Sequence, residues 1–500
     1  RRDIVPVYAL KGDPAKAFDF FKPLSGDEPH ESTRTLAMVE ALGAALYDTG
    51  HYPEALVLYP LLAKLSPARA CRYQARIAKA TLAVFPADKE RLEAELRTLH
   101  RHAEAALASF DQRAESRACA NETVAQLAET AMAWHVEAVG SGGVIGTDDV
   151  ATMESAEALY ALLLTTFSPE QLAQLEFPRL PESEWPSAAR IHYARADLAY
   201  HRERWRECGE GFLAAYEAAP DGGDAADSLY TSALCWQHLY DERHLGTGHR
   251  LGEGIELTAD ASYEPAALSE EQQGMLRAFD RYACHLRPPR GDAAALDAYV
   301  EMKFARARTY YEAAHYDRAA LAFRDIAVTH PEHEAAVYAA NLYLESLNVL
   351  GSRWHRPACI GDMRRDAPTL QRNLCTPARR AREPEQCRVI DVVVRDLHRL
   401  EAQALLESAG DDAEGVAKRR RAGELLEALW TSHGRALCKN ERSSEGCDRY
   451  ADILARSAAA YDGANMTAKA IAVRQQLVDP DNRLHGSEQA REARRTRRSA

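Results

Sequence analysis

The sequence contains no run of about 18 apolar residues, the length that a helix needs to cross a membrane. The alternating polar and apolar pattern that is typical of β-strands is nearly absent as well. Aromatic residues make up only 8% of the 500 residues, and 62 Lys and Arg stand against 75 Asp and Glu. The resulting net charge of −13 gives no general attraction to nucleic acid or anionic lipid, so we expect no nucleic acid partner.

The start of the chain lacks two further features. It begins with Arg1 and Arg2 rather than with Met, and no apolar run follows that could act as a signal peptide. We therefore expect a mature or trimmed chain, and a missing N-terminal anchor could tether the full-length protein to a membrane. The apolar fraction of 46% and the charged fraction of 27% are ordinary for globular proteins, which argues against wholesale disorder.

Motifs for catalysis and for cofactors are missing too. The glycine-rich stretch 246–252 has the wrong spacing for a dinucleotide fingerprint and lacks the Lys-Ser/Thr pair of a phosphate loop. No His-Glu-x-x-His or Gly-x-Ser-x-Gly run occurs, and no cysteine pair has the two-residue spacing of a zinc hairpin. We predict that the protein is not an enzyme and has no catalytic residue, cofactor or metal. An enzyme site within 351–460 is the alternative.

The ten cysteines are many for a cytosolic helical protein and few for a small disulfide scaffold. Cys438 and Cys447 flank a short polar connector, which a disulfide closes easily. Cys359, Cys375 and Cys387 lie in or beside a Pro/Arg-rich segment that a disulfide would hold. For two others a buried thiol is as good an interpretation as a bridge, and for the last three no pairing can be assigned: Cys208 and Cys235, then Cys71, Cys119 and Cys284. Disulfides would place the protein in an oxidising compartment.

What the sequence does contain is helical periodicity. Apolar residues recur at three- and four-residue spacing over 42–64, 151–165, 188–218, 296–328 and 389–406. Breaks with Gly, Pro, Asp or Asn separate the helical segments, as at 48–51, 219–223, 330–333 and 479–482. The pattern predicts a chain of antiparallel helical hairpins.

A repeat with a period near 34 residues runs through these hairpins. One copy has small residues in the first helix, Gly at the turn, an aromatic residue that opens the second helix, and Pro after it: Leu42, Gly43, Leu46, Gly50, Tyr52, Ala55, Tyr59 and Pro67. Two more copies are Ala307, Tyr310, Tyr316, Ala319, Phe323 and Pro331, and Ala196, Trp205, Cys208, Phe212, Ala215 and Pro220. A fourth copy at the N-terminus is Tyr8, Gly12, Ala17, Phe21 and Pro29, and a weak fifth is Gly463, Ala468 and Pro480. Small residues let the two helices approach, and aromatic residues fill the gap to the next repeat.

This pattern resembles the tetratricopeptide repeat (TPR) family, in the divergent form found in bacterial cell-envelope lipoproteins and periplasmic scaffolds. The resemblance covers roughly 1–67, 188–240 and 300–350, and the Trp expected near the start of each repeat is Val39, His192 or Lys303 here. It implies an all-α fold, a right-handed superhelix (α-solenoid) of antiparallel helical hairpins. An irregular helical solenoid outside the family is the alternative.

Composition divides the chain into seven segments. TPR-like helical segments are expected over 1–139, 150–240 and 266–350, with a loop or hinge over 241–265 and another hinge near residue 145. A Cys/Pro/Arg-rich segment, 351–387, is expected to form a disulfide-tied excursion. A C-terminal helical segment, 388–487, and a basic flexible tail, 488–500, complete the chain.

The resemblance implies that exposed positions on the first helix of each repeat line a concave groove. Aromatic residues with neighbouring charges occupy these positions: Tyr47, Tyr193, Tyr200, Phe304, Tyr311 and Tyr338, with Arg308 and Glu312. Aromatic side chains offer large contact areas at low entropic cost, which suits a peptide or helix of a partner protein. The alternative is that the tyrosines pack against neighbouring helices.

The sequence therefore predicts a non-catalytic protein–protein interaction scaffold of the bacterial cell envelope or periplasm. It would bind another protein or peptide in its groove while a complex assembles. The resemblance implies roles such as outer-membrane assembly, envelope complexes or motility machinery. A cytoplasmic TPR adaptor with ten reduced cysteines is the alternative.

Overall fold

The computed structural model describes residues 4–28, 30–110, 114–244, 263–288, 291–440, 445–484 and 487–499. Helices make up almost all of it, and one two-stranded hairpin is the only sheet in these ranges. The all-α fold predicted from the sequence is confirmed. The chain forms two compact units, Arg1–Gly248 with Ser269–Leu286 and His249–Leu268 with Arg287–Ala500. None of the described helices is long and apolar enough to span a membrane.

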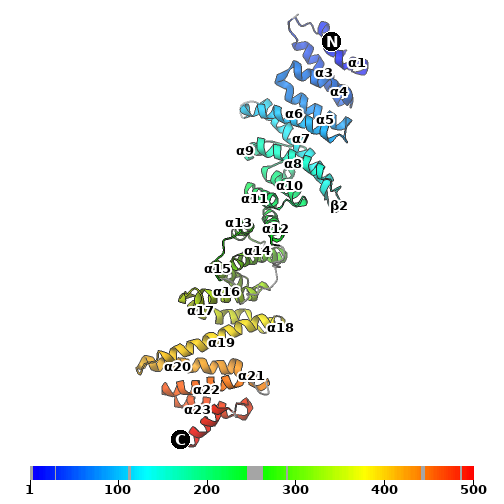
Figure 1. The fold of residues 1–500 in the computed structure, drawn as a ribbon. Coiled ribbons are helices and arrows are strands. Elements are labelled where there is room, and N and C mark those ends of the chain that lie inside the picture. Colours follow the sequence, from blue (N-terminus) through cyan, green and yellow to red (C-terminus); the bar gives the residue numbers. More distant parts are fainter. Residues whose placement is uncertain are drawn as a thin grey trace. The chain divides into compact units, whose positions relative to one another are not determined.

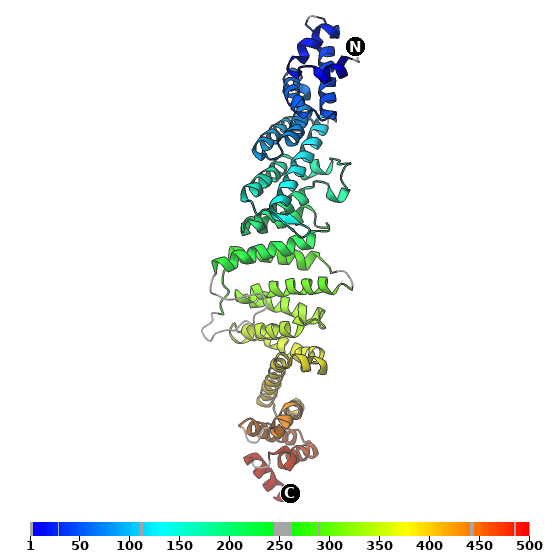
Figure 2. The ribbon, with the colours of Figure 1, turned by 90° about the vertical axis from the view of Figure 1, so that its right-hand side faces the viewer.

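In the first unit, each helix packs mainly on the helices that adjoin it in sequence, and both views show this succession (Figures 1 and 2). Its helices are α1 (Ile4–Lys11), α2 (Ala17–Ser25), α3 (Thr33–Asp48), α4 (Tyr52–Leu65), α5 (Ala70–Val84), α6 (Lys89–Ala106), α7 (Ala114–Val139), α8 (Val150–Thr166), α9 (Pro169–Ala173), α10 (Ala188–His201), α11 (Trp205–Ala218), α12 (Ala225–Arg243) and α13 (Glu270–His285). Such packing between sequence neighbours is what a helical solenoid requires.

A β-hairpin of β1 (Gly140–Ser141) and β2 (Val144–Ile145) follows the end of α7. The backbone N–H groups of Thr147 and Asp148 donate to the carbonyl oxygens of Glu137 and Ala138 at 2.9 and 2.8 Å, which fastens the hairpin to α7. Helices α7 and α8 pack directly against each other on either side of it. The segment near residue 145, where a hinge is expected, therefore forms a turn inside the first unit.

The second unit repeats the same succession of neighbouring helices (Figure 1). Its helices are α14 (Ala293–Glu312), α15 (Tyr316–Thr329), α16 (Ala335–Ser352), α17 (Pro357–Leu374), α18 (Pro377–Arg382), α19 (Pro384–Glu407), α20 (Ala413–Leu429), α21 (Arg435–Asn440), α22 (Glu445–Gly463), α23 (Thr467–Val478) and α24 (Glu488–Ser499). A π-helical turn, Trp430–Gly434, joins α20 to α21.

The Cys/Pro/Arg-rich segment 351–387 is helical rather than an irregular excursion. Helix α17 buries an apolar face, and two arginine side chains, Arg379 and Arg380, hold α18. Arg380 donates to the carboxylate of Asp391 at 2.6 and 2.9 Å and to the carbonyl oxygen of Cys375 at 3.0 Å. Arg379 is only 4% exposed and donates hydrogen bonds of 2.9–3.1 Å to the carbonyl oxygens of Pro331, Glu332 and His333. These bonds fix α18 against the turn between α15 and α16 and offset the cost of burying a guanidinium charge.

Two other predicted segments are the flexible tail and the loop before residue 266. The expected flexible tail 488–500 contains α24, which buries Ala490 and Ala493 against the rest of the second unit. Most of the expected loop 241–265 lies outside the described residues, and so does Pro29 of the N-terminal repeat. Just after that loop, the N–H of Ala266 donates to the carbonyl oxygen of Ala313 at 3.0 Å, which fastens the chain to the turn between α14 and α15.

Four hairpins end their first helix with the same turn, a Schellman motif. The second residue after the helix has a positive φ, and the N–H of the residue that follows it donates to the carbonyl oxygen five residues earlier at 2.8–2.9 Å. The positive-φ residues are Gly50 (79°), Glu203 (55°), Ala314 (58°) and Asn465 (59°). These turns join α3 to α4, α10 to α11, α14 to α15 and α22 to α23, where the sequence repeats lie. Only Gly50 adopts this conformation without a steric penalty.

Four cysteine pairs lie at disulfide distance and link neighbouring parts of the helical succession. Their Cα atoms are 5.5–5.9 Å apart, as a disulfide requires. The pairs are Cys71 (α5) with Cys119 (α7), Cys208 (α11) with Cys235 (α12), Cys375 (after α17) with Cys387 (α19), and Cys438 (α21) with Cys447 (α22). Cys359, expected among the disulfide candidates, is a free thiol, because Cys375 meets Cys387 at the other end of α17. Cys284 is also free.

The shared turn predicts opposite effects for two substitutions. Gly50→Ala should lower the free energy of unfolding by about 1 kcal/mol, because a Cβ at Gly50 contacts nothing and adds only left-handed strain. Glu203→Gly should raise it by up to about 1 kcal/mol, because the same strain is removed at an exposed position. Urea unfolding followed by circular dichroism measures both, and a loss of stability in both variants would contradict this account.

Candidate binding surface

The tyrosines expected at one groove position stabilise the turns of their hairpins. Each lies in the last turn of a first helix and meets the aromatic residue that opens the second helix, ring edge to ring face. The pairs are Tyr47 with Tyr52 at 5.4 Å, Tyr200 with Trp205 at 5.5 Å, and Tyr311 with Tyr316 at 5.3 Å. The recurrence in three hairpins shows that this position serves packing within the repeat.

Two of the predicted groove residues are in the core. Tyr311 is 2% exposed and Arg308 is 4% exposed, because α15 and α16 pack over this side of α14. The guanidinium of Arg308 donates to Glu312 at 2.6 Å, so this charge pair is used within α14. Burial raises the pKa of the Tyr311 hydroxyl, and it raises the pKa of Tyr316 to about 12. The prediction that Tyr311 and Arg308 face a partner is therefore wrong.

The other aromatic residues of the predicted groove are half-buried, and Glu312 is exposed. Tyr193 meets the ring of Phe212 at 5.0 Å, and its hydroxyl donates to Asp227. Phe304 and Tyr338 stack on each other at 5.7 Å across α14 and α16. Tyr47 is covered on one side by the guanidinium of Arg76, 5.0 Å from the ring centre. Each of these rings is thus already in contact with another side chain of the protein, and their role in binding stays a prediction.

A deeper hollow lies in the second unit, between α19 and α22, and we call it the α19–α22 groove. Helix α20 packs on both α19 and α22 and forms the floor between them. The hollow measures about 930 Å³. The lining residues are Leu426 and Leu429 of α20, Arg395, Asp396, Arg399, Gln403 and Leu406 of α19, Leu437 of α21, and Asp448, Arg449, Tyr450, Asp452, Ile453 and Arg456 of α22.

The floor of the groove is apolar. Leu426 and Leu429 are buried in a cluster shared by α19 and α20, and Leu406 and Ile453 pack against that cluster from the two walls. Because Leu406 and Ile453 are only partly buried, they still present apolar surface inside the hollow. A bound apolar side chain would remove that surface from water, at about 25 cal/mol per Å².

The rim of the groove is charged and carries an excess of arginine. Arg395 lies 3.4 Å from Asp396, and Arg456 lies 2.8 Å from Asp452, so these carboxylates are neutralised on their own walls. Two more arginines, one on each wall, have no ion pair or hydrogen bond in the described part of the chain: Arg399 and Arg449. Asp448 is the one carboxylate of the lining that also has no ion pair or hydrogen bond in the described part of the chain. The rim can therefore accept an anionic group from outside.

The end of the groove near α21 is held rigidly. Trp430 is fully buried, with its ring 6.3 Å from that of Tyr450, and the Cβ of any side chain at Gly434 would clash with both rings. The pair Cys438–Cys447 then joins α21 to α22 directly beside lining residues of both helices. The disulfide and this aromatic contact together fix the position of the α22 wall.

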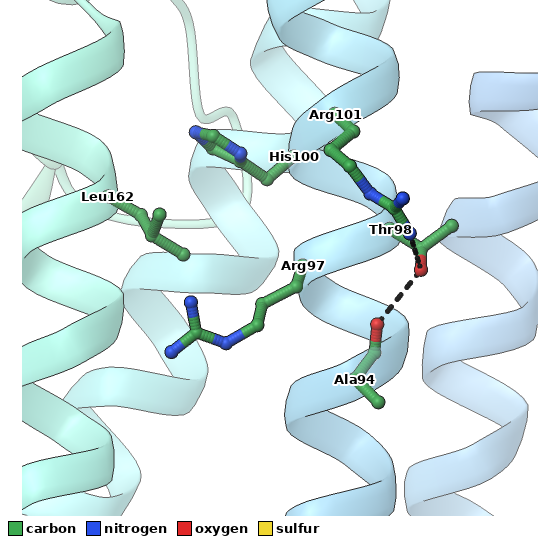
Figure 3. A pocket seen from close by; sticks show the side chains of 6 residues that line it. All are labelled: Ala94, Arg97, Thr98, His100, Arg101 and Leu162. Atoms are coloured by element: carbon green, nitrogen blue, oxygen red, sulfur yellow. Dashed lines mark hydrogen bonds between the residues drawn. The ribbon is translucent and has the colours of Figure 1, made fainter.

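A second hollow, between α6 and α8, is less suited to chemistry (Figure 3). Arg101 donates to the hydroxyl of Thr98, which itself donates to a carbonyl oxygen one turn earlier, and Arg97 pairs with Glu93 at 2.6 Å. Burial lowers the pKa of His100, whose ring lies 2.5 Å from the hydroxyl of Thr166. Its polar groups are thus satisfied internally. In the described ranges, no group of three or more His, Cys, Asp or Glu is placed to hold a metal ion.

Sequence reasoning did not find the α19–α22 groove, although the alternative site region 351–460 includes it. The signal was present in α19, which is apolar on two faces rather than one. Cys387, Ile390, Val394 and Leu397 form the buried face, while Val389, Val392 and Leu400 are 37–48% exposed. A second apolar face on a long helix indicates an unfilled contact.

The burial of these tyrosines can be tested by truncation. Tyr311→Ala should lower the free energy of unfolding by about 3–5 kcal/mol, as expected for a large ring lost from a core. Tyr200→Ala, at a half-buried position, should cost less than about 2 kcal/mol. Tyr311→Phe keeps the ring and should cost far less than Tyr311→Ala. Denaturant unfolding measures the stability of all three variants. A small loss of unfolding free energy for Tyr311→Ala would contradict the placement of this side chain in the core.

Comparison with known proteins assigns the chain to no family. A scan against protein-family models finds no match, and no curated protein matches in sequence. Among solved structures, the chain is similar to the TPR domain of P58(IPK), with 12% identity over 93% of this chain and 98% of that chain and a TM-score of 0.22. It is also similar to Naa15/Naa10 bound to HypK-THB (14% identity, 90% and 64% covered, TM-score 0.21) and to yeast Tom70 (12%, 99% and 95%, TM-score 0.17). All three TM-scores are low, and no sequence identity exceeds 14%, so none of these likenesses assigns a role to the chain.

Proposed function

We propose that the protein is a non-catalytic scaffold that binds a segment of another protein in the α19–α22 groove. The observation that supports the proposal most strongly is the groove itself, a hollow with an apolar floor and a charged rim between two helices. Binding sites for protein segments combine an apolar centre with polar edges in this way. The carboxylates of Asp396 and Asp452 pair with arginines rather than with each other, which favours recognition over acid–base catalysis.

We further propose that the protein works in an oxidising compartment, the bacterial cell envelope or periplasm, where it would help a complex to assemble. Support comes from four cysteine pairs at disulfide distance. The pair Cys438–Cys447 would also link the oxidising compartment to binding, because this pair holds the α22 wall of the groove. A cytoplasmic adaptor is the competing proposal, and it requires the same cysteines to be reduced.

A thiol count separates the two compartments. Protein purified without reductant from its native source and then denatured should react with a thiol reagent at two positions per chain, Cys284 and Cys359. After reduction, all ten cysteines should react. Peptide mapping of the labelled sites identifies which cysteines were free. Ten reactive thiols before reduction would instead support the cytoplasmic adaptor.

Binding through the groove can be tested with a photo-crosslinking amino acid at Gln403, an exposed position of the α19 wall. Illumination in an extract of the source organism should join the chain to one defined polypeptide. The matched control places the same amino acid at Leu321 of α15, which is 73% exposed and lies in the same unit. We expect no such product from Leu321.

Two outcomes of this crosslinking would contradict the proposal. One is the same set of products from Gln403 and from Leu321, which would mean non-specific contact. The other is the absence of any Gln403 product, under conditions in which the chain is folded by circular dichroism.

A further inference from the structure

We infer that the segment bound in the α19–α22 groove is an acidic amphipathic α-helix of a partner protein. This inference rests on the proposed function and adds the chemistry of the partner. Three features of the groove carry it: the spacing of residues along the α19 wall, the length of that wall, and the charges on the two rims.

The spacing comes first. Positions 389, 392, 396, 399, 403 and 406 of α19 follow one another at intervals of three and four residues, and they lie opposite the buried face formed by Ile390, Val394 and Leu397. Intervals of three and four residues are those along which one helix packs on another. The last four of these positions line the groove, and Val389 and Val392 continue the same face beyond it. The wall therefore matches a helix better than it matches an extended strand.

The length of this face sets the length of the partner helix. From 389 to 406 there are 17 residue steps, which span about 26 Å in an α-helix. The apolar side chains along this face are substantially exposed, with Val389 at 48% and Val392 at 37%. An isolated surface of this kind gains stability from a partner that covers it. A helix of four to five turns would cover it from Val389 to Leu406.

The charges decide the sign of the partner. Arg399 on the α19 wall and Arg449 on the α22 wall are exposed and have no ion pair in the described ranges, whereas Arg395 and Arg456 are already paired. Within the same ranges, Asp448 is the one carboxylate of the lining without an ion pair, so two unpaired positive charges stand against one negative charge and the free charge of the rim is net positive. A helix lying between the walls would bring its flanking side chains to both arginines. Glutamates there would form charge-assisted hydrogen bonds, while lysines would meet like charges. An acidic helix with an apolar face is thus the best-matched occupant.

Designed peptides test this directly on the full chain. The first is a fluorescein-labelled 18-residue helix with leucines on one face and glutamates beside them. The second replaces every Glu with Lys, and the third keeps the acidic composition but has a central Pro. By fluorescence anisotropy, the acidic helix should bind at least about tenfold more tightly than either control, a difference of about 1.4 kcal/mol.

Variants of the chain locate the contact. Arg399→Glu and Arg449→Glu should each weaken the acidic peptide at least about tenfold, corresponding to 1.4 kcal/mol, and the double variant should favour the Lys peptide. The matched control is Arg364→Glu, at an exposed arginine of α17 in the same unit, which should leave the affinity unchanged. Circular dichroism spectra and thermal midpoints of the variants show whether each is folded.

The outcomes separate this inference from the proposed function. The inference of an acidic helix would be overturned if the Lys peptide or the Pro peptide bound as tightly as the acidic peptide or more tightly. It would also be overturned if Arg399→Glu and Arg449→Glu had no effect on binding. A specific Gln403 crosslink in that case would still support the proposed function. A concentration-dependent dimer in sedimentation that Arg399→Glu abolishes would show a second copy of this chain as the occupant, and would overturn the inference too.

Discussion

The helices of each unit have to bury their apolar faces on the helices that adjoin them in sequence, and the rest of the structure depends on this constraint. In the described ranges, the helices bury their apolar faces mainly against helices one or two places away in the succession, such as α11 on α10 and α22 on α20. The turns then become decisive, because they set how each pair of helices meets. The shared Schellman turn, with an aromatic pair next to it in three hairpins, meets this demand in the same way each time.

The same constraint explains how the groove arises. Where α16 and α15 close over α14, the positions expected to face a partner are filled by the protein itself, as at Tyr311. Where α19 and α22 are both packed on α20, a hollow remains between the two walls. A binding surface in such a fold is thus a place where a helix keeps an apolar face that its neighbours do not cover.

Local sequence signals predicted the parts of the fold that depend on local rules. The three- and four-residue spacing of apolar residues predicts the helices, and Gly50 predicts a turn because glycine accepts a positive φ. The equivalent turn at Ala314 carries no such signal, since tertiary packing imposes it there. Within 351–387, helix α17 contains an internal proline, Pro368, and helix α18 is fastened by Arg379 rather than by an apolar residue, so neither helix was expected from the sequence. Pairing of Cys71 with Cys119, 48 residues apart, depends on which helices meet in space. The groove needs two helices that are not consecutive in sequence, so no single window reveals it.

The cysteine pairs also determine how the chain responds to a protease. The Cys71–Cys119 pair closes a ring that includes the whole of α6, and Cys438–Cys447 closes one around residues 439–446. A single cut anywhere inside either ring leaves both fragments covalently joined until a reductant is added. The α22 wall would therefore stay attached to α21 after a cut at residues 441–444, and a nicked chain would run at full length on a non-reducing gel.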